Sequence, residues 1–341
     1  AANSATSALH LACLALGVGA DDTVWTSPNT FIASANCARY CGASVGFVDI
    51  DARTYNMCAD KLAEKLLIAK AQNKLPKVVI PVHFAGQSCD MKAIHLLSKE
   101  YGFRIIEDAS HAIGAKYQDN YVGNGAFSDI CVFSFHPVKI ITSAEGGMAV
   151  TNDEQLAKHM RTHAQQGTTK SPDELTQMPG DWYYEQHTLG FNYRMTELQA
   201  ALGLSQLSRL DDFIERRHQQ FANYETLLNS FPITLPYQAE DNYSALHLYP
   251  ILLPEHNKAA RKGVFDILRQ AGIGTQVHYI PVHTQPYYQE LGFQQGDFPI
   301  TEEYYARTLS LPLFADLTYT QQERVALILK HALIANRVMS A

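Results

Sequence analysis

Two β-rich runs in the first half of the sequence lead directly into residues that could do chemistry. The run 104–107 is followed by Asp108 and, after two small residues, by His111. The run 129–135 is followed within a short turn by Lys139. Ligands of open α/β sheets bind beyond the carboxyl ends of the strands, so we expect these side chains to share one site.

A third group of polar side chains stands at the beginning of the chain. Ser4, Thr6 and Ser7 open an apolar pattern typical of a buried helix. Hydroxyl groups combined with the free N–H groups of a helix N-terminus form an anion site that suits a phosphate.

One lysine, one acid and one phosphate site are the protein groups that pyridoxal 5'-phosphate (PLP) requires. Desolvation at a strand end can lower the pKa of a lysine such as Lys139 and free its amine to attack an aldehyde. Asp108 could keep the pyridine nitrogen protonated. Each residue also has an ordinary interpretation, Lys139 as a surface charge and Asp108 as a helix cap. The combination, rather than any single residue, favours a PLP site.

Alternating strands and helices are expected to position these groups. The sequence predicts strands at 23–26, 45–50, 77–84, 104–107, 129–135 and 148–151. It predicts helices at 7–16, 31–40, 59–71 and 91–101. This alternation indicates a mostly parallel sheet that is covered on both faces.

The second half of the chain follows a different pattern. A polar stretch with Pro and Gly at 165–188 predicts a long loop, and 196–228 predicts a helical run. After it come a strand-like run at 246–253, a helix at 258–271 and a strand-like run at 275–282. We therefore predict a large PLP-binding domain over residues 1–211 and a small C-terminal domain over residues 212–341.

The composition is that of a folded globular chain, with 46% apolar and 18% charged residues. A net charge of −7 without a basic stripe predicts no nucleic-acid partner. No stretch approaches the roughly 18 apolar residues of a membrane helix. The six cysteines form no Cys-x-x-Cys pair, as expected of reduced thiols in a cytoplasmic chain. The sequence lacks an HExxH motif, and no metal is expected.

Three segments in this order, EDASHAIGAKY, FSFHPVKIITSAEGGMAVTND and LGFNYRMTELQAALGL, resemble the DegT/DnrJ/EryC1/StrS family of PLP-dependent sugar aminotransferases. The likeness begins at NSATSALHLACLALGVG and continues more weakly through GIGTQVHYIPVHTQPYY. It implies the α/β architecture of PLP-dependent fold type I: a large domain with a mixed, mostly parallel sheet and a smaller C-terminal α/β domain. Members usually carry a segment before NSATSAL, so we expect an N-terminal segment to be missing.

The resemblance also implies a role for individual positions. Its Schiff-base lysine falls on Lys139 and its pyridinium partner on Asp108. Further cofactor contacts fall on Thr6, Ser7, Phe31, His111 and Ser134, and on Asn192 acting from the partner subunit of a homodimer with shared active sites. The segment that faces the sugar nucleotide contributes His278, Tyr279 and His283, and Arg194 is a further candidate for a substrate contact.

Within the family, the PseC subgroup is the most similar in three segments, FSFHPVK, EDASHAIG and QVHYIPVH. That subgroup aminates C4 of a UDP-linked 4-keto-6-deoxy-N-acetylhexosamine in pseudaminic acid synthesis. The resemblance thus implies transfer of an amino group from L-glutamate to such a sugar. One family branch has histidine in place of the lysine and dehydrates sugars, so Lys139 favours amination. An aminotransferase for another 3- or 4-keto nucleotide sugar and a non-catalytic PLP-binding regulator remain open alternatives.

Overall fold

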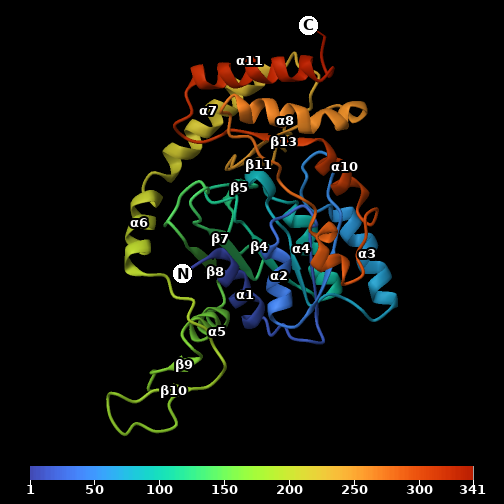
Figure 1. Ribbon diagram of the computed structural model, residues 1–341. Helices are drawn as coiled ribbons and strands as arrows, with labels where there is room; N and C mark the ends of the chain where they lie inside the picture. Colours follow the sequence, from blue (N-terminus) through green and yellow to red (C-terminus); the bar gives the residue numbers. More distant parts are fainter. Residues whose placement is uncertain (341) are drawn as a thin grey trace.

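A mixed sheet forms the centre of the molecule in a computed structural model that describes residues 1–340 (Figure 1). Its strand order is β2-β1-β3-β4-β7-β8. The strands are β1 (Thr23–Thr26), β2 (Ser44–Phe47), β3 (Val78–Ile80), β4 (Arg104–Asp108), β7 (Ile130–Ser134) and β8 (Gly147–Val150). Neighbours from β2 to β7 are parallel, and β8 is antiparallel to β7. The sequence predicts these strands correctly, with boundaries that differ by a few residues.

Both faces of this sheet are covered by helices. The helices are α1 (Ala5–Ala15), α2 (Ala33–Tyr40), α3 (Ala59–Ala71), α4 (Met91–Tyr101) and α5 (Glu154–Ala164). Val24 and Ile106 bury their side chains in one core with residues of α1, α2 and α5. Their strand neighbours Trp25 and Ile105 belong to another core with residues of α3 and α4. Because successive strand residues point to opposite faces, strands that are apolar throughout fit a sheet buried on both sides.

The C-terminal part of the chain forms a separate apolar core. Its main elements are α7 (Leu210–Leu228), β12 (Tyr249–Leu252), α8 (Arg261–Gln270), β13 (Thr308–Leu311) and α11 (Tyr319–Ala335). Tyr224, Leu268 and Leu329 are fully buried within it. Figure 1 shows these helices at the top of the molecule, with the central sheet below them. The boundary between residues 211 and 212 stays a prediction.

The chain also contains several short elements. They are η1 (Phe84–Gly86), β5 (Lys116–Tyr117), β6 (Asn120–Tyr121), β11 (Asn242–Tyr243), η2 (Glu255–Ala260), η3 (Val282–Thr284), α9 (Pro286–Gln289) and α10 (Pro299–Arg307). Of these, β11 of the C-terminal half pairs with β5 of the N-terminal half. The prediction of a strand-like run at 275–282 is wrong. Gln276 makes a single bridge to Ser310, and no strand continues from it. Pro281 has no N–H group with which to extend a ladder.

The polar stretch predicted as a loop forms an arm that projects from the molecule (Figure 1). It contains a small hairpin of β9 (Thr168–Thr169) and β10 (Glu185–Gln186). The helical run predicted after it is two helices, because α6 (Glu197–Leu207) ends before α7 begins. The break lies at Ser208, whose hydroxyl group donates to the Ser205 carbonyl oxygen at 2.9 Å.

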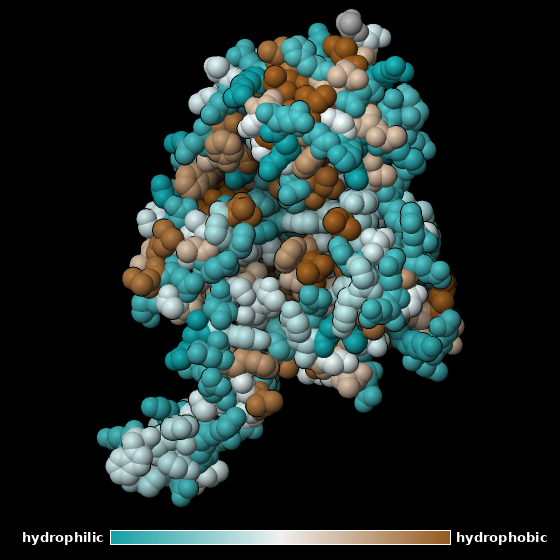
Figure 2. Space-filling model, viewed as in Figure 1, coloured by the Kyte–Doolittle hydropathy of each residue, from teal (hydrophilic) through white to brown (hydrophobic). Residues whose placement is uncertain are grey.

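Helix α6 has an unusual surface for an apolar helix, since none of its residues is buried. Leu198 is 86% exposed and Leu204 is 68% exposed. Figure 2 shows this apolar surface at the left edge of the molecule, where Figure 1 places α6. No helix among residues 1–340 combines the length and the apolar character needed to span a membrane.

Candidate active site

The N-terminus of α1 presents hydroxyl and N–H groups to a cavity at the carboxyl end of the sheet. Ser4 is the N-cap residue, and its Oγ accepts a hydrogen bond from the Ser7 N–H group at 3.1 Å. Ser4 and Thr6 line the cavity. The Ser7 hydroxyl instead donates to Asn3 Oδ1 at 2.6 Å, and Ser7 is not a lining residue. Of the three hydroxyl groups predicted for the anion site, those of Ser4 and Thr6 therefore belong to residues that line the cavity, and a cofactor contact of Ser7 stays a prediction.

Gly147 in β8 allows the sheet to approach this helix end closely. A Cβ atom at Gly147 would lie 2.4 Å from the Ala5 nitrogen and 2.5 Å from the Ser4 carbonyl carbon. Both neighbours are backbone atoms that cannot move aside without shifting the helix. The glycine thus keeps the N-terminus of α1 beside the end of β7.

Asp108 ends β4 with its carboxylate held in a fixed orientation. The residue is 4% exposed, and Oδ2 accepts a 2.6 Å hydrogen bond from Ser34 Oγ while Oδ1 accepts one from the Ser110 N–H group at 3.1 Å. Because Ser34 donates to Asp108, the Thr30 hydroxyl, 2.8 Å away, donates to Ser34 in turn. These two hydrogen bonds fix the orientation of the Asp108 carboxylate at the edge of the cavity.

Lys139 lies in the turn that follows β7, and its side chain lines the same cavity. The turn is closed by a hydrogen bond from the Lys139 N–H group to the His136 carbonyl oxygen at 2.9 Å. Burial lowers the pKa of Lys139 to about 8, although the charge of Asp108 acts in the opposite direction. Near neutral pH a larger fraction of this amine is therefore unprotonated than of an ordinary lysine.

The cavity that joins these groups has a volume of about 280 Å³. Besides Asp108 and Lys139, its walls contain most of the residues that the sequence predicts for a cofactor site, namely Thr6, Phe31, His111 and Ser134. The C-terminal part of the chain contributes His278 and Tyr279. The structure thus brings together side chains from five separate segments.

The wall formed by His111 and Tyr279 is polar but uncharged. The Ala85 N–H group donates to His111 Nδ1 at 3.3 Å, so the imidazole proton lies on Nε2 and points toward the Tyr279 hydroxyl oxygen, 3.0 Å away. Burial, with a smaller effect of the Lys139 charge, places the pKa of His111 well below its usual value. Burial also raises the pKa of Tyr279. The Tyr279 hydroxyl hydrogen is therefore available to the cavity.

Besides Ser7, three predicted site residues do not line this cavity. Asn192 and Arg194 are exposed, and Arg194 Nε donates to Asn192 Oδ1 at 3.1 Å. His283 is fully buried, with Nε2 2.9 Å from Glu302 Oε1 and its ring against Phe298. The position of His283 offers no direct contact with a molecule in the cavity. A role of Asn192 in the partner subunit stays a prediction.

Sequence reasoning did not single out Ser34 as a site residue. Ser34 lies one helical turn after Phe31, and its only signal is that spacing, which places a hydroxyl near the same face as the predicted ring contact. A serine near a helix N-terminus is usually interpreted as part of a helix cap. The sequence also gives no sign that Ser34 contacts Asp108, which lies 74 residues further along the chain.

Residues 1–330 match the model of the DegT/DnrJ/EryC1/StrS aminotransferase family. The chain belongs to this family. The predicted family is thereby confirmed.

Several DegT/DnrJ/EryC1/StrS proteins are similar over most of their length. The spore coat polysaccharide biosynthesis protein SpsC of Bacillus subtilis is 40% identical over 93% of this chain and 81% of its own length. The UDP-4-amino-4,6-dideoxy-N-acetyl-beta-L-altrosamine transaminase of Campylobacter jejuni is 38% identical over 92% and 80%. The solved structure of Helicobacter pylori PseC, an aminotransferase involved in pseudoaminic acid biosynthesis, is 32% identical with a TM-score of 0.88, over 98% and 86%.

The cofactor of DegT/DnrJ/EryC1/StrS aminotransferases is PLP, and the predicted fold and cofactor are both confirmed. The residues of this chain fit it. An amine, a buried carboxylate and a helix N-terminus with two hydroxyl groups line one cavity, which is the donor set that PLP requires. Within residues 1–340, no group of three or more His, Cys, Asp and Glu side chains is arranged to hold a metal ion.

Proposed function

We propose that the chain transfers an amino group from L-glutamate to C4 of a UDP-linked 4-keto-6-deoxy-N-acetylhexosamine. The observation that carries this proposal is the single cavity in which Lys139, Asp108 and the N-terminus of α1 meet the polar pair His278 and Tyr279. The likeness to the transaminase of C. jejuni and to PseC supports the choice of sugar.

The roles of the protein groups follow from their chemistry. When bound, PLP supplies an aldehyde carbon and a ring that accepts an electron pair. Lys139, with its lowered pKa, is the amine that would hold PLP through this carbon and that would carry the proton to and from the substrate carbon. Asp108 holds a proton at the ring nitrogen, and Ser34 and Ser110 keep its carboxylate oriented for that role. Ser4 and Thr6 bind the phosphate with the first N–H groups of α1.

The sugar nucleotide is expected to meet neutral hydrogen-bonding groups. Burial lowers the pKa of His278 to about 4, so its imidazole is neutral at physiological pH. Its Nδ1 atom lies 2.8 Å from Ser310 Oγ, which fixes the ring. We assign His278 and Tyr279 to the sugar side of the cavity. His283 is buried against Glu302 and lies outside the cavity.

The same proposal includes a homodimer, in the cytoplasm, with shared active sites. The apolar surface of α6, with Leu198 and Leu204 exposed, is a surface that a second copy could cover. Asn192, Arg194 and the projecting arm lie immediately before α6 in the chain. These residues could therefore reach the cavity of a partner held on α6.

A two-stage spectroscopic experiment tests the proposal. The PLP-loaded enzyme should lose its visible absorbance when L-glutamate is added and regain it when the UDP-4-keto sugar is added, with the 4-amino sugar detected by mass spectrometry. The same protocol with a UDP-3-keto sugar measures the choice of substrate. An absorbance that glutamate does not change would contradict an aminotransferase. Recovery of the visible absorbance with the UDP-3-keto sugar but not with the UDP-4-keto sugar would contradict the C4 assignment.

A further inference from the structure

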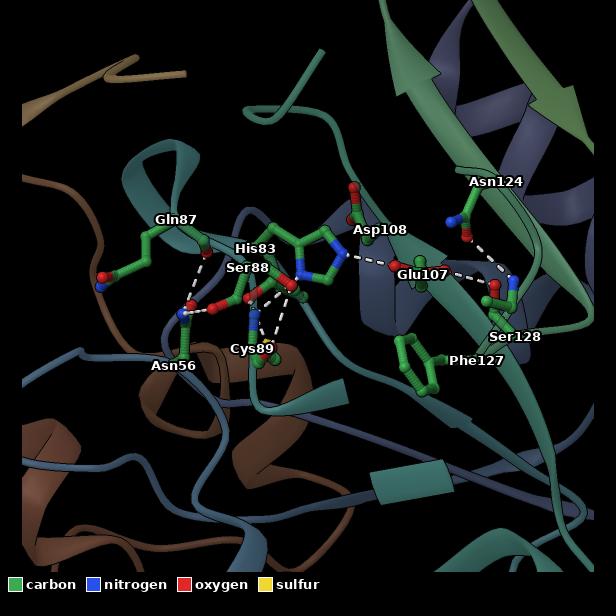
Figure 3. Close-up of polar contacts among 12 residues, drawn as sticks. Asn56, His83, Gln87, Ser88, Cys89, Glu107, Asp108, Asn124, Phe127 and Ser128 are labelled. Carbon is green, nitrogen blue, oxygen red and sulfur yellow. Dashed lines mark hydrogen bonds and ion pairs between the residues drawn. The ribbon is translucent and has the colours of Figure 1, made fainter. Parts of the chain in front are cut away.

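A second carboxylate is buried directly beside Asp108. Glu107 is 4% exposed, and as its neighbour in β4 it points to the opposite face of the sheet. Its Oε2 atom lies 2.8 Å from His83 Nε2, and Ser128 Oγ donates to Oε1. Figure 3 shows His83, Glu107 and Ser128 in one line of polar contacts next to Asp108. Glu107 does not line the cavity, so contact with a substrate does not explain its burial.

His83 contacts both carboxylate residues, one through its side chain and one through its backbone. The His83 N–H group donates to the Asp108 carbonyl oxygen at 3.1 Å, and the Asp108 N–H group donates to the Pro81 carbonyl oxygen at 2.9 Å. The Cys89 N–H group donates to His83 Nδ1 at 3.1 Å. Nδ1 therefore carries the lone pair, and the Nε2–H group donates to Glu107. This side chain is fully buried and satisfied at both ring nitrogens.

The loop that follows His83 reaches the wall of the cavity. Ala85 has a φ of 58°, and its N–H group is the donor that fixes the tautomer of His111. The Ala85 carbonyl oxygen accepts from the His247 N–H group at 2.8 Å. Asn56 closes the loop with hydrogen bonds to the Phe84 N–H group and to the carbonyl oxygens of residues 87 and 88. Figure 3 shows Asn56 beside this loop.

From this geometry we propose that His83 is a positioning residue for Asp108, acting through the buried carboxylate of Glu107. The inference rests on the proposed role of Asp108 at the cofactor ring. His83 joins the end of β3 to β4, and Ser128 joins β4 to the segment before β7. Loss of the imidazole would leave the Glu107 carboxylate buried with one hydrogen-bond donor fewer, which costs free energy. Protonation of Glu107 or a shift of β4 would relieve this cost. Either change alters the position or the electrostatic surroundings of Asp108.

The test measures the pH midpoint at which the visible absorbance of the PLP-loaded enzyme changes. We expect His83→Ala to move this midpoint in the same direction as Asp108→Asn, by about half a pH unit, and to weaken PLP binding about tenfold. His83→Gln, whose amide can donate to Glu107 and accept from Cys89, should restore most of the wild-type absorbance midpoint and most of the PLP affinity. Ser128→Ala, which removes the other donor to Glu107, gives a milder second variant should His83→Ala not fold.

A second buried histidine–glutamate pair provides a matched control. His283 and Glu302 are 2.9 Å apart, and the His283 side chain is as completely buried as that of His83. His283→Ala should lower the melting temperature but leave the absorbance midpoint unchanged. If His83→Ala and Ser128→Ala also change only the melting temperature, His83 and Glu107 are structural and the inference is wrong.

The Asp108→Asn background separates this inference from the proposed function. In that background, His83→Ala should no longer move the midpoint but should still lower the melting temperature. A shift that persists there would mean that His83 acts on the cofactor by another route, which overturns the inference. A midpoint that Asp108→Asn itself does not move would instead refute the role proposed for Asp108.

Discussion

At the scale of single residues, the lowered pKa of Lys139 predicts how fast the apoenzyme captures PLP at each pH. Only the neutral amine attacks the aldehyde, so the second-order rate constant should rise with pH and level off above the pKa of about 8. A solvated lysine would give a rate that keeps rising toward pH 10.4. Stopped-flow absorbance between about pH 6 and pH 10 measures this profile.

Lys65 is a matched control for this prediction. Burial lowers its pKa to about 8 as well, but it lies outside the cavity, donating to the Phe47 carbonyl oxygen and packing over the Trp25 ring. After borohydride reduction, peptide mapping should find the cofactor on Lys139, and Lys65→Arg should leave capture unchanged. An adduct on Lys65 would mean that low pKa alone, without the cavity, directs the reaction.

The sequence predicts the chemical centre of the site better than its supporting hydrogen bonds. Lys139 and Asp108 could be paired because each follows a strand, and parallel strand ends meet at one edge of the sheet. The donation of Ser34 to Asp108 and of Ala85 to His111 could not be predicted, because both depend on how separate loops pack. The hydrogen bond from the Ser7 hydroxyl group to Asn3 could not be predicted either, since spacing does not reveal that this group turns back along the chain.

At the scale of secondary-structure elements, the exposed face of α6 predicts its role in assembly. Leu198→Glu and Leu204→Glu place charges on a surface that is exposed within one chain, and Glu is nearly as good a helix former as Leu. We expect both variants to fold but to sediment as monomers, because burying an unpaired charge in a dimer interface is costly.

An exposed leucine on another helix controls for the effect of adding a charge. Leu67 of α3 is 64% exposed, close to the value for Leu204. Leu67→Glu should leave the sedimentation coefficient unchanged. Monomeric wild-type enzyme, or α6 variants that sediment as dimers, would show that α6 does not form the interface.

Elements of the central sheet are easier to predict than those of the C-terminal part. The helices at 59–71 and 91–101 match α3 and α4 residue for residue, because each has a clear apolar face between turn signals. The run 275–282 is apolar and β-branched enough to suggest a strand. Its backbone instead leaves the Gln276–Ser310 bridge to bring His278 and Tyr279 to the cavity, so a tertiary requirement overrides local preference.

At the scale of the whole molecule, the position of Asn192 separates it from the cavity of its own chain. It is exposed beside Arg194, before α6, and is not a lining residue. If α6 holds two copies together, Asn192 is free to complete the cofactor site of the partner. A two-fold dimer then contains two equivalent sites, each built from both chains.

Subunit complementation tests this shared site. Lys139→Ala and Asn192→Ala homodimers should each be severely impaired. In a mixed dimer one site lacks both groups, while the other takes Lys139 from one chain and Asn192 from the other and is intact. Random pairing makes half of the dimers mixed and half of their sites intact, so roughly a quarter of all sites should recover. Differently tagged subunits verify the exchange. If Asn192 serves its own chain, no site in the mixture is whole, and activity stays at the level of the parents even where exchange is complete.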